Sequence, residues 1–130
     1  MPSVRETNAT LVKLLTNVVA PSYTAGAAVE AGEAVYLDSN GYIQPCAGDA
    51  VATNFPIGVA LQDLASGGRG NVAISGMRVL CLTGATPGGI VYTMDTAGEI
   101  DHTGGTKKAV VGVAESATVL LVMPWMVSFS

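Results

Sequence analysis

The feature that most constrains the fold is a hairpin pattern that occurs twice along the chain. Residues 34–45 read AVYLDSNGYIQP, and residues 90–101 read IVYTMDTAGEID. In each stretch a short run of strand-forming residues leads to a polar turn with glycine and then to a second such run, which is typical of a β-hairpin. A Gly-Val-Ala segment follows each hairpin, at residues 58–60 and 112–114. Elements recurring in the same order predict a duplicated scaffold unit.

Glycine also sets the length of the expected strands. All 16 glycines lie beyond Tyr23, and they separate short runs rich in Val, Ile and Leu. Such runs and turns indicate a sandwich or a barrel and not alternating strands and helices. We expect strands near residues 34–38, 41–45, 56–62, 70–75, 77–83, 90–94, 98–101, 109–115 and 118–123. The predicted fold is all-β, a compact β-sandwich or barrel with an internal pseudo-repeat, preceded by an N-terminal arm or short helix.

The 130 residues suffice for one domain with a real core. Residues 1–22 are predicted to form an N-terminal docking segment, residues 23–124 the β domain, and residues 125–130 an apolar tail. Four apolar residues of the first segment follow helical spacing: Leu11, Leu14, Leu15 and Val18. The threonines and asparagines among them weaken a helix, and an isolated helix of this length is marginal in water. The segment must therefore dock, either on its own domain or on a neighbour.

Composition favours a protein that assembles with itself. Only 12% of the residues are charged, against about 25% in soluble domains. A monomer with so few charges has difficulty covering its surface, so burial against other subunits is expected. The alternative is a monomer whose surface is built from Ser, Thr, Asn and Gly. The net charge is −4 and no basic face is visible, which argues against nucleic-acid binding. No apolar run approaches the roughly 20 residues of a membrane span.

The candidate residues for catalysis or metal binding have simpler structural interpretations. The turn after Asp38 lacks the glycine and glutamate positions of a calcium loop, and residues 68–73 match G-x-G-x-x-A in a stretch that indicates a strand. His102 has no nucleophile elbow to serve. Cys46 and Cys81 lack metal-binding spacing, so free thiols are expected, although a disulfide stays open. We therefore predict no enzyme activity, no metal and no cofactor.

The C-terminal stretch VLLVMPWMVSFS is more informative. We expect a strand at residues 119–123 that Pro124 ends, followed by an apolar tail. That tail either folds over its own core or contacts a partner, because large apolar side chains anchor interfaces. With the N-terminal stripe it gives the candidate interface residues Leu11, Leu14, Leu15, Val18, Trp125, Met126 and Phe129.

Together these motifs resemble those of a known family. The pattern Ala-Gly-x-Ala-Val-Tyr-x-Asp at residues 31–38 precedes a glycine hairpin and then Pro-Ile-Gly-Val-Ala at residues 56–60, with Ala65 and Gly67 beyond. The second half repeats part of it at residues 91–92 and 111–114. The pattern is similar to that of the small capsid decoration (cement) proteins of tailed bacteriophages. The resemblance covers roughly residues 24–123.

That resemblance implies a structural virion protein, commonly a homotrimer, made in the host cytoplasm and bound to the outer surface of an icosahedral head. There it would clamp neighbouring major capsid proteins against the pressure of packaged DNA, with no direct nucleic-acid or membrane contact. Three joined copies convert weak single contacts into firm attachment. The alternative is a receptor- or glycan-binding β-sandwich module of a phage fibre, for which the single tryptophan is a weak signal.

Overall fold

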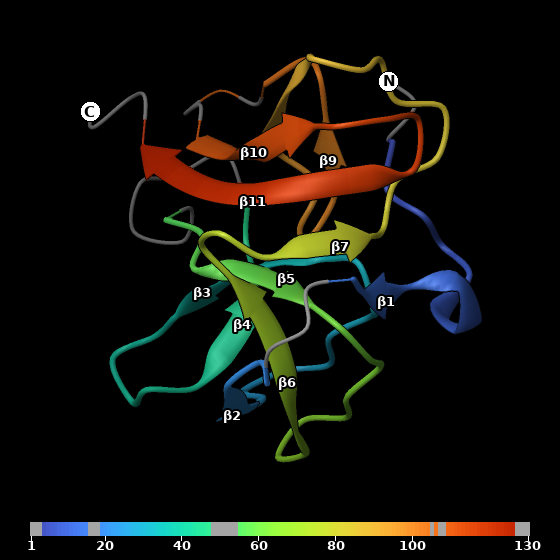
Figure 1. Ribbon diagram of the computed structural model, residues 1–130. Helices are drawn as coiled ribbons and strands as arrows, with labels where there is room; N and C mark the ends of the chain where they lie inside the picture. Colours follow the sequence, from blue (N-terminus) through green and yellow to red (C-terminus); the bar gives the residue numbers. More distant parts are fainter. Residues whose placement is uncertain (1–3, 16–18, 48–54, 105, 107–108, 127–130) are drawn as a thin grey trace.

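The chain folds into two antiparallel β-sheets that pack as a sandwich (Figure 1). The computed structural model describes residues 4–15, 19–47, 55–104, 106 and 109–126. One sheet has 6 strands in the order β1-β7-β11-β10-β8-β9, and the other has 5 in the order β2-β6-β5-β3-β4. The predicted all-β fold is confirmed. Of the two architectures expected, the described residues form the sandwich, without a closed barrel.

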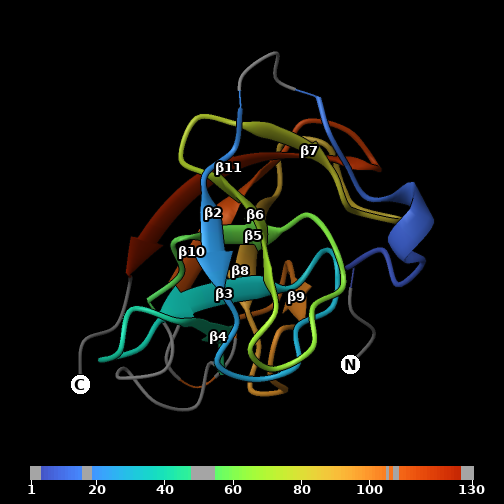
Figure 2. The same cartoon turned by 90° about the horizontal axis from the view of Figure 1, so that it is seen from below.

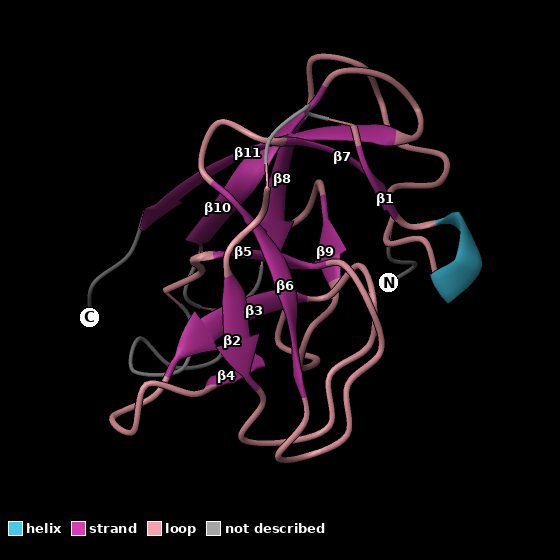
Figure 3. Cartoon of the chain, turned by 60° about the horizontal axis from the view of Figure 1, so that its bottom comes forward, coloured by secondary structure: helices cyan, strands magenta, loops and turns pink. Residues whose placement is uncertain are grey.

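All nine predicted strands are present, and two short ones, β1 and β2, were not predicted. The strands are β1 (Lys13–Leu14), β2 (Ser22–Thr24), β3 (Ala34–Leu37), β4 (Ile43–Pro45), β5 (Gly58–Ala60), β6 (Arg69–Ile74), β7 (Arg78–Leu80), β8 (Ile90–Thr93), β9 (Ile100–Asp101), β10 (Ala109–Ala114) and β11 (Val119–Met126). The one helical element among the described residues is a 3-10 turn, η1 (Ala9–Leu11), drawn in cyan in Figure 3.

The internal repeat is present in the strand order. Strands β2 to β6, the first lobe, are ordered 2-6-5-3-4, and strands β7 to β11, the second lobe, are ordered 7-11-10-8-9. Backbone hydrogen bonds repeat as well. The N–H of Gly32 donates to the carbonyl of Ala60 at 2.8 Å, and the N–H of Gly88 donates to that of Ala114 at 2.7 Å. Each lobe therefore forms one sheet by the same path, and β1 adds an edge strand to the second.

The paired Gly-Val-Ala strands need glycine for the same reason in both lobes. Gly58 pairs with β6 and Gly112 with β11. A Cβ atom at Gly58 would collide with the carbonyl oxygen of Ala73, and one at Gly112 with that of Leu121. Ala73 and Leu121 hold equivalent places in the register, one residue before each glycine's partner. The repeated glycine thus permits a close approach of two strands.

The last strand corrects one expectation, because Pro124 does not end it. Strand β11 continues to Met126 and stays paired with β10, where Val110 lies opposite Trp125. The register shifts between Val110 and Gly112, so that one extra residue of β11 is accommodated. Strand β7 begins at Arg78, opposite Leu121, so its pairing with β11 does not reach Pro124, which needs no ladder hydrogen bond on that side. Proline is tolerated at such bulges and edges.

Two cores follow from alternating residues of the first lobe's sheet, which Figure 2 shows from below. Val35, Ile43, Ala60 and Val72 fill a small core within the first lobe, together with Val29, Ala25 and Leu64 from its loops. Residues on the opposite face join the interior of the second lobe in the larger core. The first lobe's sheet is therefore buried on both faces. This is the main asymmetry of the molecule.

Candidate functional site

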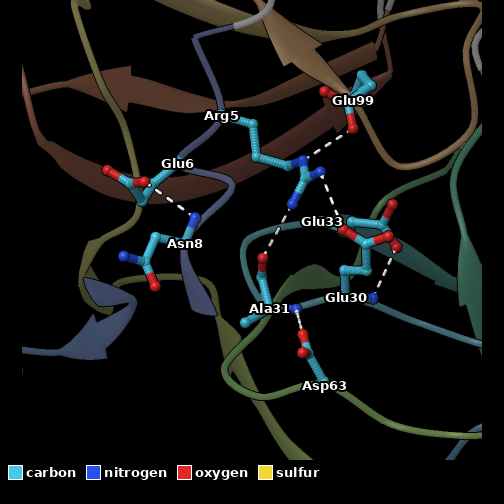
Figure 4. Close-up of polar contacts among 8 residues, drawn as sticks. All are labelled: Arg5, Glu6, Asn8, Glu30, Ala31, Glu33, Asp63 and Glu99. Atoms are coloured by element: carbon cyan, nitrogen blue, oxygen red, sulfur yellow. Dashed lines mark hydrogen bonds and ion pairs between the residues drawn. The ribbon is translucent and has the colours of Figure 1, made fainter. Parts of the chain in front are cut away.

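The N-terminal segment is anchored by a buried arginine. Only 5% of the Arg5 side chain is exposed. Its Nε donates to Glu99 Oε2 at 2.8 Å, its Nη1 to the carbonyl of Ala31 at 3.0 Å, and its Nη2 to Glu30 Oε1 at 3.3 Å (Figure 4). Glu30 and Ala31 belong to the first lobe, and Glu99 precedes β9 of the second. One guanidinium thus ties the segment to both lobes.

A buried carboxyl, Glu33, lies beside this arginine (Figure 4). Its Oε1 accepts a hydrogen bond from the N–H of Glu30 at 2.9 Å. Burial raises the pKa of Glu33, while the hydrogen bond from Glu30 and the charge of Arg5 oppose the rise. Desolvation is the larger effect because the side chain also packs against the backbone of Gly98. The cluster around Arg5 therefore joins the two lobes, and it contains one carboxyl, Glu33, whose charged form is disfavoured by burial.

The joint continues into the turn between β8 and β9. The N–H of Gly98 donates to the carbonyl of Cys46 at 2.6 Å, and the N–H of Ala34 donates to the carbonyl of Gly98 at 3.2 Å. Gly98 has a φ of 80°, in the left-handed region where glycine is favoured. The second lobe's turn is therefore seated on the first lobe by two main-chain hydrogen bonds.

An apolar surface lies on the outer face of the second lobe. Cross-strand pairs place Ile90 opposite Val113 and Val113 opposite Leu121, all on the side away from the core. Further apolar residues on this outer face are Tyr92, Val110, Val119, Leu80 and Trp125. Ile90 is 44% exposed and Trp125 is 69% exposed. Exposed apolar patches of this kind are found at sites of interaction in other proteins.

A pocket of about 420 Å³ opens beside this outer face, lined by Thr86, Gly89, Ile90, Tyr92 and His102. The N–H of Thr86 donates to His102 Nε2, and His102 Nδ1 lies 2.9 Å from the carbonyl of Ile90. Because Nε2 accepts, the proton of the neutral ring is on Nδ1 and is donated to Ile90. Both ring nitrogens hold the wall of the pocket, so the histidine has a structural role.

The structure separates the predicted interface residues. Leu14 packs against the larger core of its own domain, whereas Leu11 is 48% exposed and Leu15 is 45% exposed. The extended course at β1 breaks the helical stripe that their spacing suggested, because the segment pairs with the edge of β7. Val18, Phe129 and the Met126 side chain lie outside the described residues.

Trp125 stands at the far end of β11, on the outer face of the second lobe, and the other members of that face were missed. A signal was present in the sequence. The stretches IVY, VVGV and VLLV are apolar at consecutive positions, where a strand with one wet face would alternate. Consecutive apolar residues indicate a strand that is covered on both sides.

The residues considered for chemistry serve the fold. Asp38 caps its own hairpin, accepting from the N–H groups of Asn40 and Tyr42. Residues 68–73 fall in β6 and its lead-in. Cys46 and Cys81 are buried free thiols, and burial raises the pKa of Cys81 to about 12, which suppresses the reactive thiolate. Within the described ranges, no cluster of three His, Cys, Asp or Glu residues is placed to hold a metal ion.

Among the described residues, no helix has the length and apolar character needed to span a bilayer. No protein-family model matches the chain, and no curated protein is similar to it.

Proposed function

We propose that this protein is a capsid decoration protein, a structural component of a tailed-phage virion that binds the outside of the head and clamps neighbouring major capsid proteins. The observation that carries the proposal is the uncovered apolar outer face of the second lobe, because such a surface fits a protein that acts by assembly. The sequence resemblance supplies the partner class. On this proposal the protein assembles as a homotrimer on the capsid surface after synthesis in the host cytoplasm.

The architecture supports the same role. Two sheets joined by tight turns give a rigid body, and Arg5 and the Gly98 turn fix the lobes to each other. A clamp needs rigidity, because ordering a flexible body on binding would cost free energy and weaken its attachment. The exposed Leu11 and Leu15, near one edge of the six-stranded sheet, are the proposed capsid contacts.

The test is a binding assay with purified phage heads that lack decoration protein. Saturable occupancy, together with a higher temperature of head disruption, is expected for the wild-type chain. Leu11→Asp with Leu15→Asp should lower occupancy while the circular dichroism spectrum is unchanged, since both side chains are exposed. Leu14 is unsuitable for this purpose because it packs against the core.

The control is Phe55→Asp, a change at a residue that is 57% exposed and precedes β5; it should leave occupancy unchanged. Absence of binding to heads, with specific signals on a glycan array instead, would replace the decoration role by the fibre-module alternative.

A further inference from the structure

The outer face of the first lobe is already covered within the chain. Ala34 pairs with Val59, and Val59 with Ala73, so the three side chains lie on one face of the sheet. All three are 0% exposed and belong to the larger core. The strands β5 and β6 that carry two of them pack against β11 of the second lobe. One lobe thus buries its outer face against a strand of the other.

The equivalent face of the second lobe has no such cover from the described residues. The repeated register makes Ile90, Val113 and Leu121 the counterparts of Ala34, Val59 and Ala73. All three counterparts are apolar, and Ile90 and Leu121 are larger than the alanines they replace, yet Ile90 is 44% exposed and the other two are only partly buried. A surface that is sealed in one lobe is therefore open in the other.

The turns repeat the same asymmetry. Gly98 is seated on Ala34 and Cys46, and its counterpart Gly41, with an almost identical φ of 79°, lies in the turn between β3 and β4. No atom would lie within 4 Å of a Cβ added at Gly41. Beside it, Tyr42 is 44% exposed and Leu37 is 42% exposed. The first lobe's turn thus exposes apolar side chains, and nothing in the described part of the chain packs against Gly41 as the first lobe packs against Gly98.

The pocket beside Ile90 corresponds to the seat of Gly98, with Gly89 at the position of Glu33 and Ile90 at that of Ala34. Gly89 carries no side chain, and the ring of His102 lies where its Cβ atom would be, so no carboxyl occupies this place as Glu33 does in the first lobe. The carbonyl of Gly89 accepts from Ala114 at 2.9 Å, so in the alternating antiparallel pattern the N–H of Ile90 points away from β10, as that of Ala34 points away from β5.

We infer that the outer face of the second lobe, with this pocket, binds the first lobe of a second copy of this chain, and that the turn at residues 38–42 is the inserted element. If the two lobes were related by a two-fold axis, the turn at residues 38–42 would occupy the pocket of its own chain. Nothing lies within 4 Å of a Cβ added at Gly41, so the turn is not seated there. The relation is therefore head-to-tail, and repeating it between chains extends the internal contact until a ring closes. The inference gives the self-association within the proposed function its two surfaces, and it does not depend on the capsid.

Sedimentation of the full-length chain at micromolar concentration, without capsids, tests the pairing. The wild type should sediment as a closed oligomer. Ile90→Lys damages only the face and Tyr42→Lys damages only the turn, so each variant alone should sediment as a monomer. An equimolar mixture of the two should form dimers, because one intact face then meets one intact turn. Phe55→Lys, at a residue that is 57% exposed and lies on neither surface, should assemble like the wild type.

Each alternative result overturns the inference. A monomeric wild type removes the interface, although binding to heads would leave the decoration role standing. Oligomers that survive both substitutions place the contact elsewhere. A mixture that stays monomeric shows that the face and the turn are not each other's partners. Melting temperatures of both variants near that of the wild type exclude unfolding as the cause, since both residues are exposed.

Discussion

The two lobes share one strand order but solve the problem of a two-sided sheet differently. In the first lobe, small residues such as Ala34 and Ala73 form an outer face on which the second lobe packs closely. In the second lobe the same positions hold Ile90 and Leu121, which remain at the surface. A duplicated unit therefore yields one satisfied and one unsatisfied copy of the same contact. Duplication of the unit has thus produced one contact that is filled within the chain and an equivalent surface that is left open.

The N-terminal segment adds a second difference between the lobes. In the first lobe the N–H of Gly26 reaches the carbonyl of Ile43 directly, at 2.8 Å. In the second lobe Val4 stands between the equivalent strands, donating to the carbonyl of Ile100 at 3.0 Å and accepting from the N–H of Thr83 at 2.7 Å. The second lobe is thus completed by an extended segment from outside the repeat, which bridges Leu82 at Arg5 and is secured by the Arg5 side chain.

The largest expected effect tests whether the lobes are built alike. Gly58→Ala and Gly112→Ala each push a Cβ into a backbone carbonyl that cannot move without breaking the sheet. We expect each to lower the free energy of unfolding by about 3 kcal/mol or more, the upper range for overpacked cores. Denaturant unfolding measures both. Gly41→Ala is the control, because it meets open space and suffers only a positive φ, worth about 1–2 kcal/mol.

Unequal losses at Gly58 and Gly112 would break the comparison, because they would mean that only one lobe depends on the close strand approach.

The next effect sharpens the role of the segment that only the second lobe needs. Arg5→Met should lower the free energy of unfolding by about 2–3 kcal/mol, because it leaves the part-buried Glu99 carboxylate and the buried carbonyl of Ala31 without their partner. Glu99 is 21% exposed, which keeps the loss below that of a fully buried pair. Arg78→Met is the matched control. The Arg78 side chain is 54% exposed where it pairs with Glu115, and such pairs are worth under about 1 kcal/mol.

Equal losses for Arg5→Met and Arg78→Met in urea titrations would remove Arg5 as the joint between the lobes.

The repeated strand order of the two lobes could largely be predicted from the sequence, whereas the role of the N-terminal segment in the second lobe could not. Turns such as Asn40-Gly41 and the Gly-Val-Ala strands are local signals, so the strands and the repeat could be predicted. Strands β1 and β2 are two and three residues long, and they exist because β7 and β6 offer edges far along the chain. Arg5 meets Glu99 across 94 positions, and no spacing rule connects residues so distant. The seating of one lobe on the other is likewise a property of tertiary packing.

A smaller effect concerns Glu33, whose counterpart in the second lobe is Gly89. Burial raises the pKa of Glu33 above its ordinary value of 4.5. Its contribution to stability is then complete below that value and is lost as the pH rises through the folded-state pKa. We expect Glu33→Gln, which keeps an oxygen for the N–H of Glu30, to melt above the wild type at neutral pH, since the buried charge is gone.

Melting curves from acidic to neutral pH measure this difference, which should close below about pH 4.5. A wild type that melts above Glu33→Gln at neutral pH would show that the attraction of Arg5 for the charged Glu33 outweighs the cost of burying it.

The smallest effect compares the two turns. Asp38 is held within its own hairpin, chiefly by the Nε2 of Gln44 at 2.6 Å, whereas Asp95 accepts from the N–H and Oγ1 of Thr106, both at 2.8 Å. These hydrogen bonds lower the pKa of both carboxyls, with Gln44 the largest cause at Asp38 and the Thr106 N–H the largest at Asp95. Each group thus stabilises the fold above the ordinary value of 3.8, and the benefit is lost as the pH falls through the lowered pKa.

We expect Gln44→Ala to raise the pKa of Asp38 and leave that of Asp95 unchanged, as followed by NMR titration of the side-chain carboxyls. Thr106→Val should raise the pKa of Asp95 only in part, because the backbone N–H of residue 106 remains. The change in melting temperature should be slight for both variants, since water replaces the lost donor at a surface carboxylate. A shift of Asp95 on mutation of Gln44 would mean that the turns are coupled through the seat of Gly98, and the lobes could then not be treated as two independent copies of one hairpin.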